Sequence, residues 1–180
     1  MTTFDLNFAA DHFTLFGLEC CQGLNVAELE TKFREVQAQV HPDRHAHGTE
    51  SDQRLAMQWA TRVNEAYQTL KTPLNRARYL LHLLGHDAQV ESNTAMPVEF
   101  LMAQMELRET VEEAKVGADE TALDDARSAV INEMKSEYRR MEQLIDQERN
   151  YAAATALVRQ LMFQEKLLHE IDEALEAVLA

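Results

Sequence analysis

The strongest constraint on the fold is an amphipathic helical pattern that Pro42 cuts off. Apolar residues recur at intervals of 4, 3 and 4 residues, which is the period of a helix with one buried face. These residues are Leu29, Phe33, Val36 and Val40. Asn25 is a suitable N-cap, with Glu28 three residues later as in a capping box. The helix is expected to end at His41, because proline disfavours helical geometry in the residue before it.

A second amphipathic helix follows after the polar loop 41–50. Its expected inward-facing residues are Leu55, Trp59, Val63, Ala66, Tyr67 and Leu70. Thr49 or Ser51 is placed to cap it. Pro73 ends it and suits the first position of a shorter helix, for which Gly85 is a natural stop. With a short helix near residues 11–18, the N-terminal unit is predicted to be two long helices flanked by shorter ones.

The C-terminal half is predicted to form an antiparallel bundle of three helices. Residues 86–96 lack periodicity and are interpreted as a linker. Helices are expected at about 97–116, 120–148 and 151–178, and their short connections favour antiparallel packing. On the last helix the expected buried residues are Leu157, Leu161, Leu168, Ile171, Leu175 and Val178.

The first helix of this bundle carries two apolar stripes. One suits the bundle core and comprises Phe100, Ala103, Leu107, Val111 and Ala114. The other comprises Val98, Leu101, Met102 and Met105. A helix that is apolar on two faces needs two partners. The first partner is its own bundle, whereas periodicity leaves open whether the second is the N-terminal unit or another protein.

Composition supports an all-α globular chain whose acidity lies in its second half. Helix-forming Ala, Leu, Glu and Gln dominate, and 5 Gly and 3 Pro in 180 residues leave little material for a turn-rich β fold. Residues 86–180 hold 21 Asp and Glu against 9 Lys and Arg, and so carry −12 of the net charge of −14. This acidity argues against nucleic acid or an anionic membrane as a partner.

The adjacent Cys20 and Cys21 suit neither a structural disulfide nor a metal site. Together with Asp5 and Asp11, where a secretory signal would be basic, they predict a reduced cytoplasmic protein. No phosphate-binding glycine loop or nucleophile elbow is present. The sequence therefore predicts a binding protein without a cofactor rather than an enzyme.

The tripeptide His41-Pro42-Asp43 suits a docking loop between the two long helices. Proline limits the entropy that the loop loses on binding, and the carboxylate of Asp43 can pair with an arginine of a partner. Two other interpretations stay open. The tripeptide can be a plain helix stop and turn, or His41, Asp43, His45 and His47 can supply ligands to a metal.

The position of this tripeptide between two amphipathic helices resembles the J domain of the DnaJ superfamily. The resemblance implies a fold in which two antiparallel helices present the tripeptide at their shared tip. It also implies docking on an Hsp70-type ATPase, with a basic face that would involve Lys32, Arg34 and Arg44. Glu28, Glu30 and Glu35 make that face thinner than in many J domains.

Three segments, DHFTLFGL, PLNRARYLLHLLG and FLMAQMELRE, resemble HscB-type co-chaperones of iron–sulfur cluster assembly. The resemblance implies a J domain over 1–85 and a scaffold-binding three-helix bundle over 97–180, joined by the linker 86–96. The implied partners of a monomeric chain are an HscA-type Hsp70, whose ATPase it stimulates, and an IscU-type scaffold protein. The scaffold contact would involve Leu101, Met102, Met105, Glu106, Glu109 and Phe163. A J-domain adaptor with an unrelated client remains an alternative.

Overall fold

The computed structural model describes residues 7–45, 48–86 and 96–179. Within these ranges every regular element is helical, which confirms the predicted all-α class. The chain divides into two compact units, Met1–Leu80 and Leu81–Ala180. The point of division lies inside helix α4 (Pro73–Leu83).

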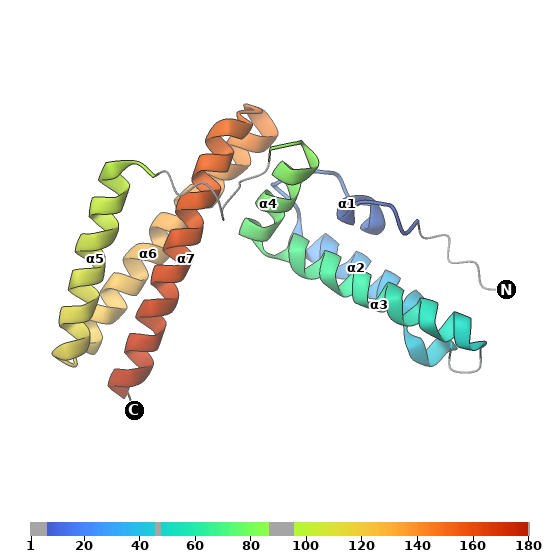
Figure 1. Ribbon diagram of the computed structural model, residues 1–180, viewed down its shortest axis with the longest axis horizontal. Helices are drawn as coiled ribbons and strands as arrows, with labels where there is room; N and C mark the ends of the chain where they lie inside the picture. The colour runs from blue at the N-terminus through green and yellow to red at the C-terminus, as the bar shows by residue number, and fades with distance from the viewer. Residues whose placement is uncertain (1–6, 46–47, 87–95, 180) are drawn as a thin grey trace. The chain divides into compact units, whose positions relative to one another are not determined.

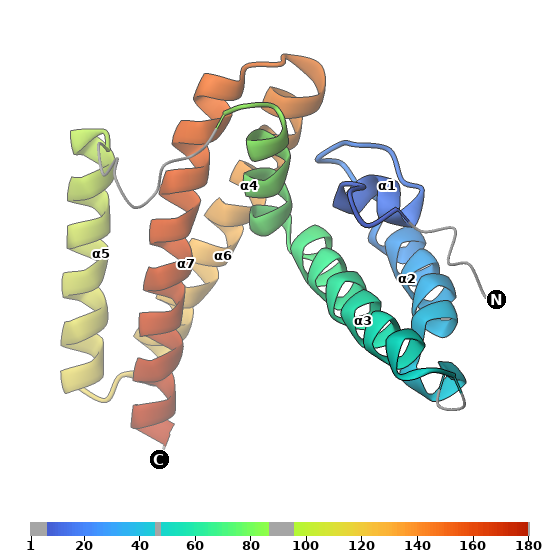
Figure 2. The same cartoon turned by 45° about the vertical axis from the view of Figure 1, so that its right-hand side comes forward.

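The first unit is built on two long helices, α2 (Val26–Val40) and α3 (Glu50–Lys71). Figures 1 and 2 both show them side by side, and they make the largest interhelical contact of this unit. Helix α1 (His12–Phe16) packs on both. The short 3₁₀ helix η1 (Pro42–His45) follows α2 directly and contacts α3. The predicted helical hairpin is therefore present, with His-Pro-Asp at its turn.

Side-chain caps explain where these helices begin. The Asn25 side chain accepts hydrogen bonds from the N–H groups of Ala27 and Glu28, at 3.0 and 3.3 Å. Of the two candidates for α3, Thr49 is the cap, and it forms a reciprocal capping box with Asp52. Such caps satisfy N–H groups that the first helical turn leaves without partners.

The core of the first unit follows most of the predicted stripes, although Phe33 is only half-buried and one position on α3 is wrong. Leu55 was expected inside, but its side chain is 39% exposed, and Ala56 is fully buried instead. Both positions fit a helical period that includes Trp59. Choosing Leu55 because it is the larger apolar residue gave the wrong buried position. The face that α3 turns inward is set by its contact with α1 and α2.

The second unit is a three-helix bundle, as predicted. It comprises α5 (Val98–Val116), α6 (Glu120–Glu142) and α7 (Tyr151–Leu179), and each helix contacts the other two. The predicted second helix of the bundle ends in a π-helical segment, η2 (Gln143–Gln147), rather than in regular α-helix. Asn150 then caps α7 by accepting a hydrogen bond from the N–H of Ala153 at 3.2 Å.

Two of the predicted stripes in this bundle are wrong in part. Leu161 and Ile171 are buried as expected, whereas Leu157, Leu168, Leu175 and Val178 are only half-buried. The buried path of α7 runs instead through Ala154, Val158, Leu161, Gln164, Leu167, Ile171 and Ala174. On α5, Ala103 is exposed and Gln104 takes the core position. A stripe chosen by hydrophobicity cannot find glutamine in a core, because glutamine is usually exposed.

Candidate functional site

The His-Pro-Asp turn is an exposed and locally ordered structure. His41 has φ −59° and ψ 127°, an extended geometry that ends α2 before Pro42, as predicted. The N–H of Asp43 donates to Nδ1 of His41 at 3.3 Å, and the N–H of Arg44 donates to the carbonyl of His41 at 3.0 Å. The side chains of His41 and Asp43 are 52% and 91% exposed. Both therefore face solvent, where a partner can reach them.

This geometry assigns a role to each nitrogen of the His41 ring. Because Nδ1 accepts a hydrogen bond from the backbone, the proton of the neutral imidazole belongs on Nε2. The Asp43 carboxylate, with Oδ2 at 3.6 Å from Nδ1, is near enough to pair with a protonated ring. The turn thus offers an N–H donor and a carboxylate acceptor side by side.

The three basic residues expected near the turn are held by local partners. Lys32 pairs with Glu35 at 3.2 Å, and Arg34 pairs with Glu30 at 3.8 Å. Exposed ion pairs of this kind contribute little stability, so a partner's carboxylates can compete for these cations. Arg44 donates from a guanidinium nitrogen to the carbonyl of Ala38 at 2.9 Å. Its position therefore also closes the last turn of α2, a role that the sequence did not indicate.

The alternative metal site in the 41–47 loop involves His47, which lies outside the described residues. Among the residues that the structure does describe, no group of three or more His, Cys, Asp or Glu side chains is arranged to hold a metal ion.

The second candidate site is an apolar surface on α5, here called the α5 patch. It comprises Val98, Leu101, Met102 and Met105, whose exposed fractions are 65%, 38%, 57% and 63%. Glu106 and Glu109 are exposed on the same helix. Large side chains this exposed and this close together are unusual on a protein surface and commonly mark an interaction site.

Phe163 of α7, the remaining predicted scaffold residue, lies half-buried beside α5. Its ring centroid is 6.5 Å from that of Phe100, with the ring planes at 84°. This edge-to-face contact is a favourable arrangement for two aromatic rings. Phe163 therefore reaches the α5 helix through Phe100, which occupies the helix between Val98 and Leu101. The ion pair between Arg108 and Glu170, at 2.9 Å, also joins α5 to α7.

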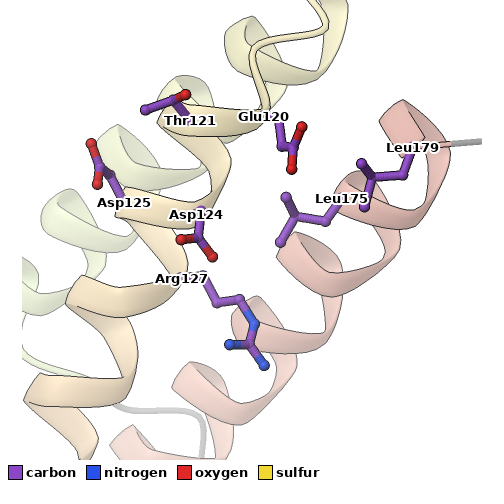
Figure 3. Close-up of a pocket in the computed structure, with 7 residues that line it drawn as sticks. All are labelled: Glu120, Thr121, Asp124, Asp125, Arg127, Leu175 and Leu179. Carbon is purple, nitrogen blue, oxygen red and sulfur yellow. The ribbon is translucent and has the colours of Figure 1, made fainter.

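A polar groove of about 500 Å³ lies between the start of α6 and the end of α7 (Figure 3). Its lining is Glu120, Thr121, Asp124, Asp125, Arg127, Leu175 and Leu179. The guanidinium of Arg127 donates to Asp172 at 2.6 Å, and this hydrogen bond raises the pKa of Arg127. Leu175 is twelve residues beyond Phe163, or roughly 18 Å along the helix, so the groove is separate from the α5 patch.

None of the helices in the described part of the chain combines the length and hydropathy that a bilayer crossing requires. Both candidate sites are exposed turns or helix faces, and such surfaces are suited to docking other proteins.

Comparison with known proteins agrees with this arrangement. Residues 96–172 match the family model described as the HSCB C-terminal oligomerisation domain. The chain is 48% identical over 172 residues to a protein of Ralstonia nicotianae named "Co-chaperone protein HscB homolog", covering 95% of this chain and 98% of that protein. A protein of the same name from Paraburkholderia phymatum is 50% identical over 165 residues, which is 92% of this chain and 94% of that one.

Solved structures give the same result. Chaperone HscB from Vibrio cholerae superposes with a TM-score of 0.81 at 35% identity, over 94% of this chain and 99% of that chain. Human co-chaperone protein HscB superposes with a TM-score of 0.86 at 25% identity, over 92% of this chain and 82% of that chain. The helical fold and the near-complete coverage at high identity lead to one conclusion: this chain belongs to the HscB family of co-chaperones.

Proposed function

We propose that this chain binds an IscU-type iron–sulfur scaffold protein and brings it to an HscA-type Hsp70, whose ATPase it stimulates. The observation that carries the proposal is the exposed α5 patch in a chain that already presents an exposed His-Pro-Asp turn in its other unit. Two exposed recognition elements in two compact units are what an adaptor between two proteins requires.

The His41-Pro42-Asp43 turn is the proposed Hsp70 contact. Its backbone is held by hydrogen bonds from Asp43 and Arg44 to His41, so little order has to be created on binding. The Asp43 carboxylate, 91% exposed, is available to an arginine of the partner. Lys32, Arg34 and Arg44 supply positive charge nearby for an acidic partner surface.

The α5 patch, with Glu106, Glu109 and Phe163, is the proposed scaffold contact. Met102 and Met105 are unbranched and adapt their shape to a partner surface. Leu101 supplies additional apolar area, and the two carboxylates form the polar edge that surrounds the apolar centre of most protein interfaces. This combination fits a protein partner whose contact surface is apolar with a basic margin.

In this mechanism ATP is hydrolysed by the Hsp70 and not by the co-chaperone. One chain that holds both proteins raises the effective concentration of the scaffold at the substrate site of the Hsp70. The chain itself holds no cluster in this proposal, because its two cysteines are adjacent in sequence, whereas clusters are held by sets of spaced cysteines.

The proposal includes the division of labour expected from the sequence. Residues 1–85 would dock the Hsp70, residues 97–180 would dock the scaffold, and 86–96 would link them, of which 87–95 lie outside the described residues. A monomer in the cytoplasm is the proposed working form. Sedimentation of the purified chain measures its oligomeric state. The measurement matters because the matching family model is described as an oligomerisation domain.

Steady-state ATPase assays of an HscA-type Hsp70 test the function. We expect stimulation by this chain, and greater stimulation when the scaffold is added. Stimulation that is the same with and without the scaffold would support the alternative of an adaptor with an unrelated client. Absence of stimulation, with this Hsp70 and with a general one, would exclude the proposal.

A further inference from the structure

A layer of polar side chains interrupts the apolar core of the second unit. Gln104 of α5 is 5% exposed and Gln164 of α7 is fully buried. Glu137 of α6 is half-buried overall, but its Oε2 atom is inaccessible to solvent. Within the described residues, Oε1 of Gln104, Oε2 of Glu137 and both side-chain polar atoms of Gln164, Oε1 and Nε2, lack a well-formed hydrogen bond. Because buried polar atoms are normally paired, this layer requires an explanation beyond packing.

The contacts between α6 and α7 place Glu137 and Gln164 at the same height in the bundle. Tyr138, the residue after Glu137, donates its hydroxyl to Glu165, the residue after Gln164, at 3.1 Å. The amide of Gln164 is also close enough to Glu137 to lower the pKa of that carboxyl somewhat. The two side chains therefore meet across the interface between these helices.

The contact between α5 and α7 brings the same layer next to the proposed scaffold surface. Phe163 lies against Phe100, and Gln164 is the next residue after Phe163 along α7. Gln104 lies one helical turn after Phe100 and directly before Met105 of the α5 patch. Two residues of the polar layer, Gln104 and Gln164, are thus the buried sequence neighbours of Met105 and Phe163, which belong to the proposed scaffold surface.

The carboxyl group of Glu137 is poised between two protonation states. Burial raises the pKa of Glu137 to about 7, and the negative charge of Glu133 on the same helix adds to the effect. The other group that acts on this carboxyl is the amide of Gln164 on α7, which opposes the shift. Tyr138 on α6 is influenced by Glu137 and donates its hydroxyl to Glu165. Burial, and then Glu165, raise the pKa of the Tyr138 hydroxyl, so it stays neutral. Near neutral pH, Glu137 is therefore divided between its acid and its anion.

The two states differ in what they offer Gln164. The neutral acid can donate its O–H to the amide oxygen and accept from the amide nitrogen, which gives two complementary hydrogen bonds. The carboxylate can only accept, so the amide oxygen is left without a donor. The anion also places an incompletely solvated charge beside Glu133, which is unfavourable. The neutral form therefore holds α7 against α6 more firmly than the anion does.

We propose that Glu137 is a positioning residue for the scaffold surface: its protonated carboxyl, through Gln164, holds Phe163 against Phe100, and its ionisation loosens that contact. This inference rests on the proposed function of the α5 patch and Phe163. It makes scaffold affinity rise as pH falls through neutrality, without Glu137 touching the scaffold.

Scaffold affinity measured from pH 6 to pH 8 tests the inference with the full-length chain. A carboxyl with a pKa of about 7 passes from mostly neutral to mostly ionised over this range, so affinity is expected to fall by up to about tenfold relative to a non-titrating variant. Glu137→Gln keeps the shape and the hydrogen-bonding capacity but cannot ionise, and it should bind tightly at every pH. Comparing the two proteins at each pH cancels any titration of the scaffold itself.

Glu133→Gln is the matched control. It removes a neighbouring charge, so the midpoint of the affinity change should move to lower pH while both plateau affinities stay the same. A merely structural role of Glu137 predicts no such movement. An identical pH profile for the unaltered chain and Glu137→Gln would overturn the inference.

A measurement without the scaffold separates this inference from the proposed function. The carbon-13 chemical shift of the Glu137 carboxyl and the ring resonances of Phe163, both followed by NMR, should change with pH at the same midpoint. The change at Phe163 should vanish in Glu137→Gln. If no scaffold binds at any pH, the proposed function fails while this coupling can still be observed. If the Phe163 ring resonances do not change as Glu137 titrates, the polar layer does not position that ring.

Discussion

His41 accepts, at Nδ1, a hydrogen bond of 3.3 Å from the backbone N–H of Asp43. The imidazole therefore shapes the turn in which it lies, while its Nε2 edge and the Asp43 carboxylate are left for a partner. The bond is local and exposed, so its loss should not reach the core.

Replacement of His41 by Gln is expected to abolish stimulation of the Hsp70 ATPase and to leave the fold intact. The His41 side chain is 52% exposed, and a glutamine oxygen can still accept from the N–H of Asp43. The free energy of unfolding should change by no more than about 0.5 kcal/mol. Circular dichroism and ATPase assays check both parts, with His169→Gln, an exposed histidine on α7, as the control. Unfolding of the His41 variant would contradict the assigned role.

The double variant Leu101→Ala, Met105→Ala should weaken scaffold binding by at least about tenfold, because a few residues near the centre of an interface carry most of the binding energy. Basal stimulation of the Hsp70 should persist, since the turn at His41 is untouched. Titration calorimetry measures the affinity. Leu179→Ala, which removes a similarly exposed side chain from the same bundle, should bind normally. Equal affinities for all three proteins would exclude the α5 patch as the scaffold contact.

Arg76→Leu is expected to destabilise the first unit by about 2–4 kcal/mol, because it leaves buried carbonyl groups without their donor. Arg76 is 5% exposed and donates to the carbonyls of Gln22, at 2.9 Å, and Leu70, at 2.6 Å. Urea unfolding followed by fluorescence of Trp59, the single tryptophan of the chain, reports on this unit alone. The exposed Arg78→Leu is the control, and a similar loss in both variants would argue against a special role for Arg76.

Acidification should destabilise the first unit through His12. Burial, and then the positive charge of Arg62, lower the pKa of His12, while Glu65 and Asp11 oppose the shift only in part. The unfolded chain therefore takes up a proton at higher pH than the folded one, and stability is lost as pH falls below about 6.5.

His12→Phe should remove this part of the acid sensitivity. The phenyl ring can preserve the stacking on Tyr79, whose ring centroid is 4.1 Å away, and the hydrogen bond from the backbone N–H of residue 12 to the Tyr79 hydroxyl does not depend on the side chain. Melting of the Trp59 signal between pH 5 and pH 8 is the measurement. Unchanged acid sensitivity in the variant would assign the effect to other groups.

The second unit should respond to pH in the opposite direction. The pKa of Glu137 is raised to about 7 in the folded chain, so its contribution to stability is complete below about 4.5 and is lost as pH rises through about 7. Glu137→Gln should therefore stabilise the bundle at pH 8, by about 1 kcal/mol after allowance for its half-exposed side chain. Hydrogen exchange of the α6 and α7 amides measures this, and equal protection in both proteins at pH 8 would contradict it.

The ends and caps of the helices were predictable where they depend only on residues close together in the sequence. Pro42 ends α2 at His41, Asn25 and Thr49 cap their helices, and Gly85, at φ 79°, follows the end of α4. Each outcome depends on backbone sterics or on one hydrogen bond between residues a few positions apart. The residues of the α5 patch were also recognisable as a second apolar stripe on one helix, whereas periodicity left open whether the first unit or another protein covers that stripe.

The facing of helices in the cores was less predictable. Leu55 and Ala56, or Ala103 and Gln104, are adjacent positions that fit one helical period almost equally well. Choosing the more apolar residue failed in both cases, because a helix that packs against two neighbours is oriented by the whole contact rather than by one side chain.

Local geometry and periodicity were sufficient to predict the helical class, the limits of most helices and the position of the His-Pro-Asp turn. By contrast, the meeting of Glu137 and Gln164 between α6 and α7 and the burial of Arg76 against two carbonyl groups depend on tertiary packing between residues distant in sequence. Polar residues carry no periodic signal that separates a buried position from an exposed one. Their burial is decided by the approach of other helices, which becomes known only when the chain is folded.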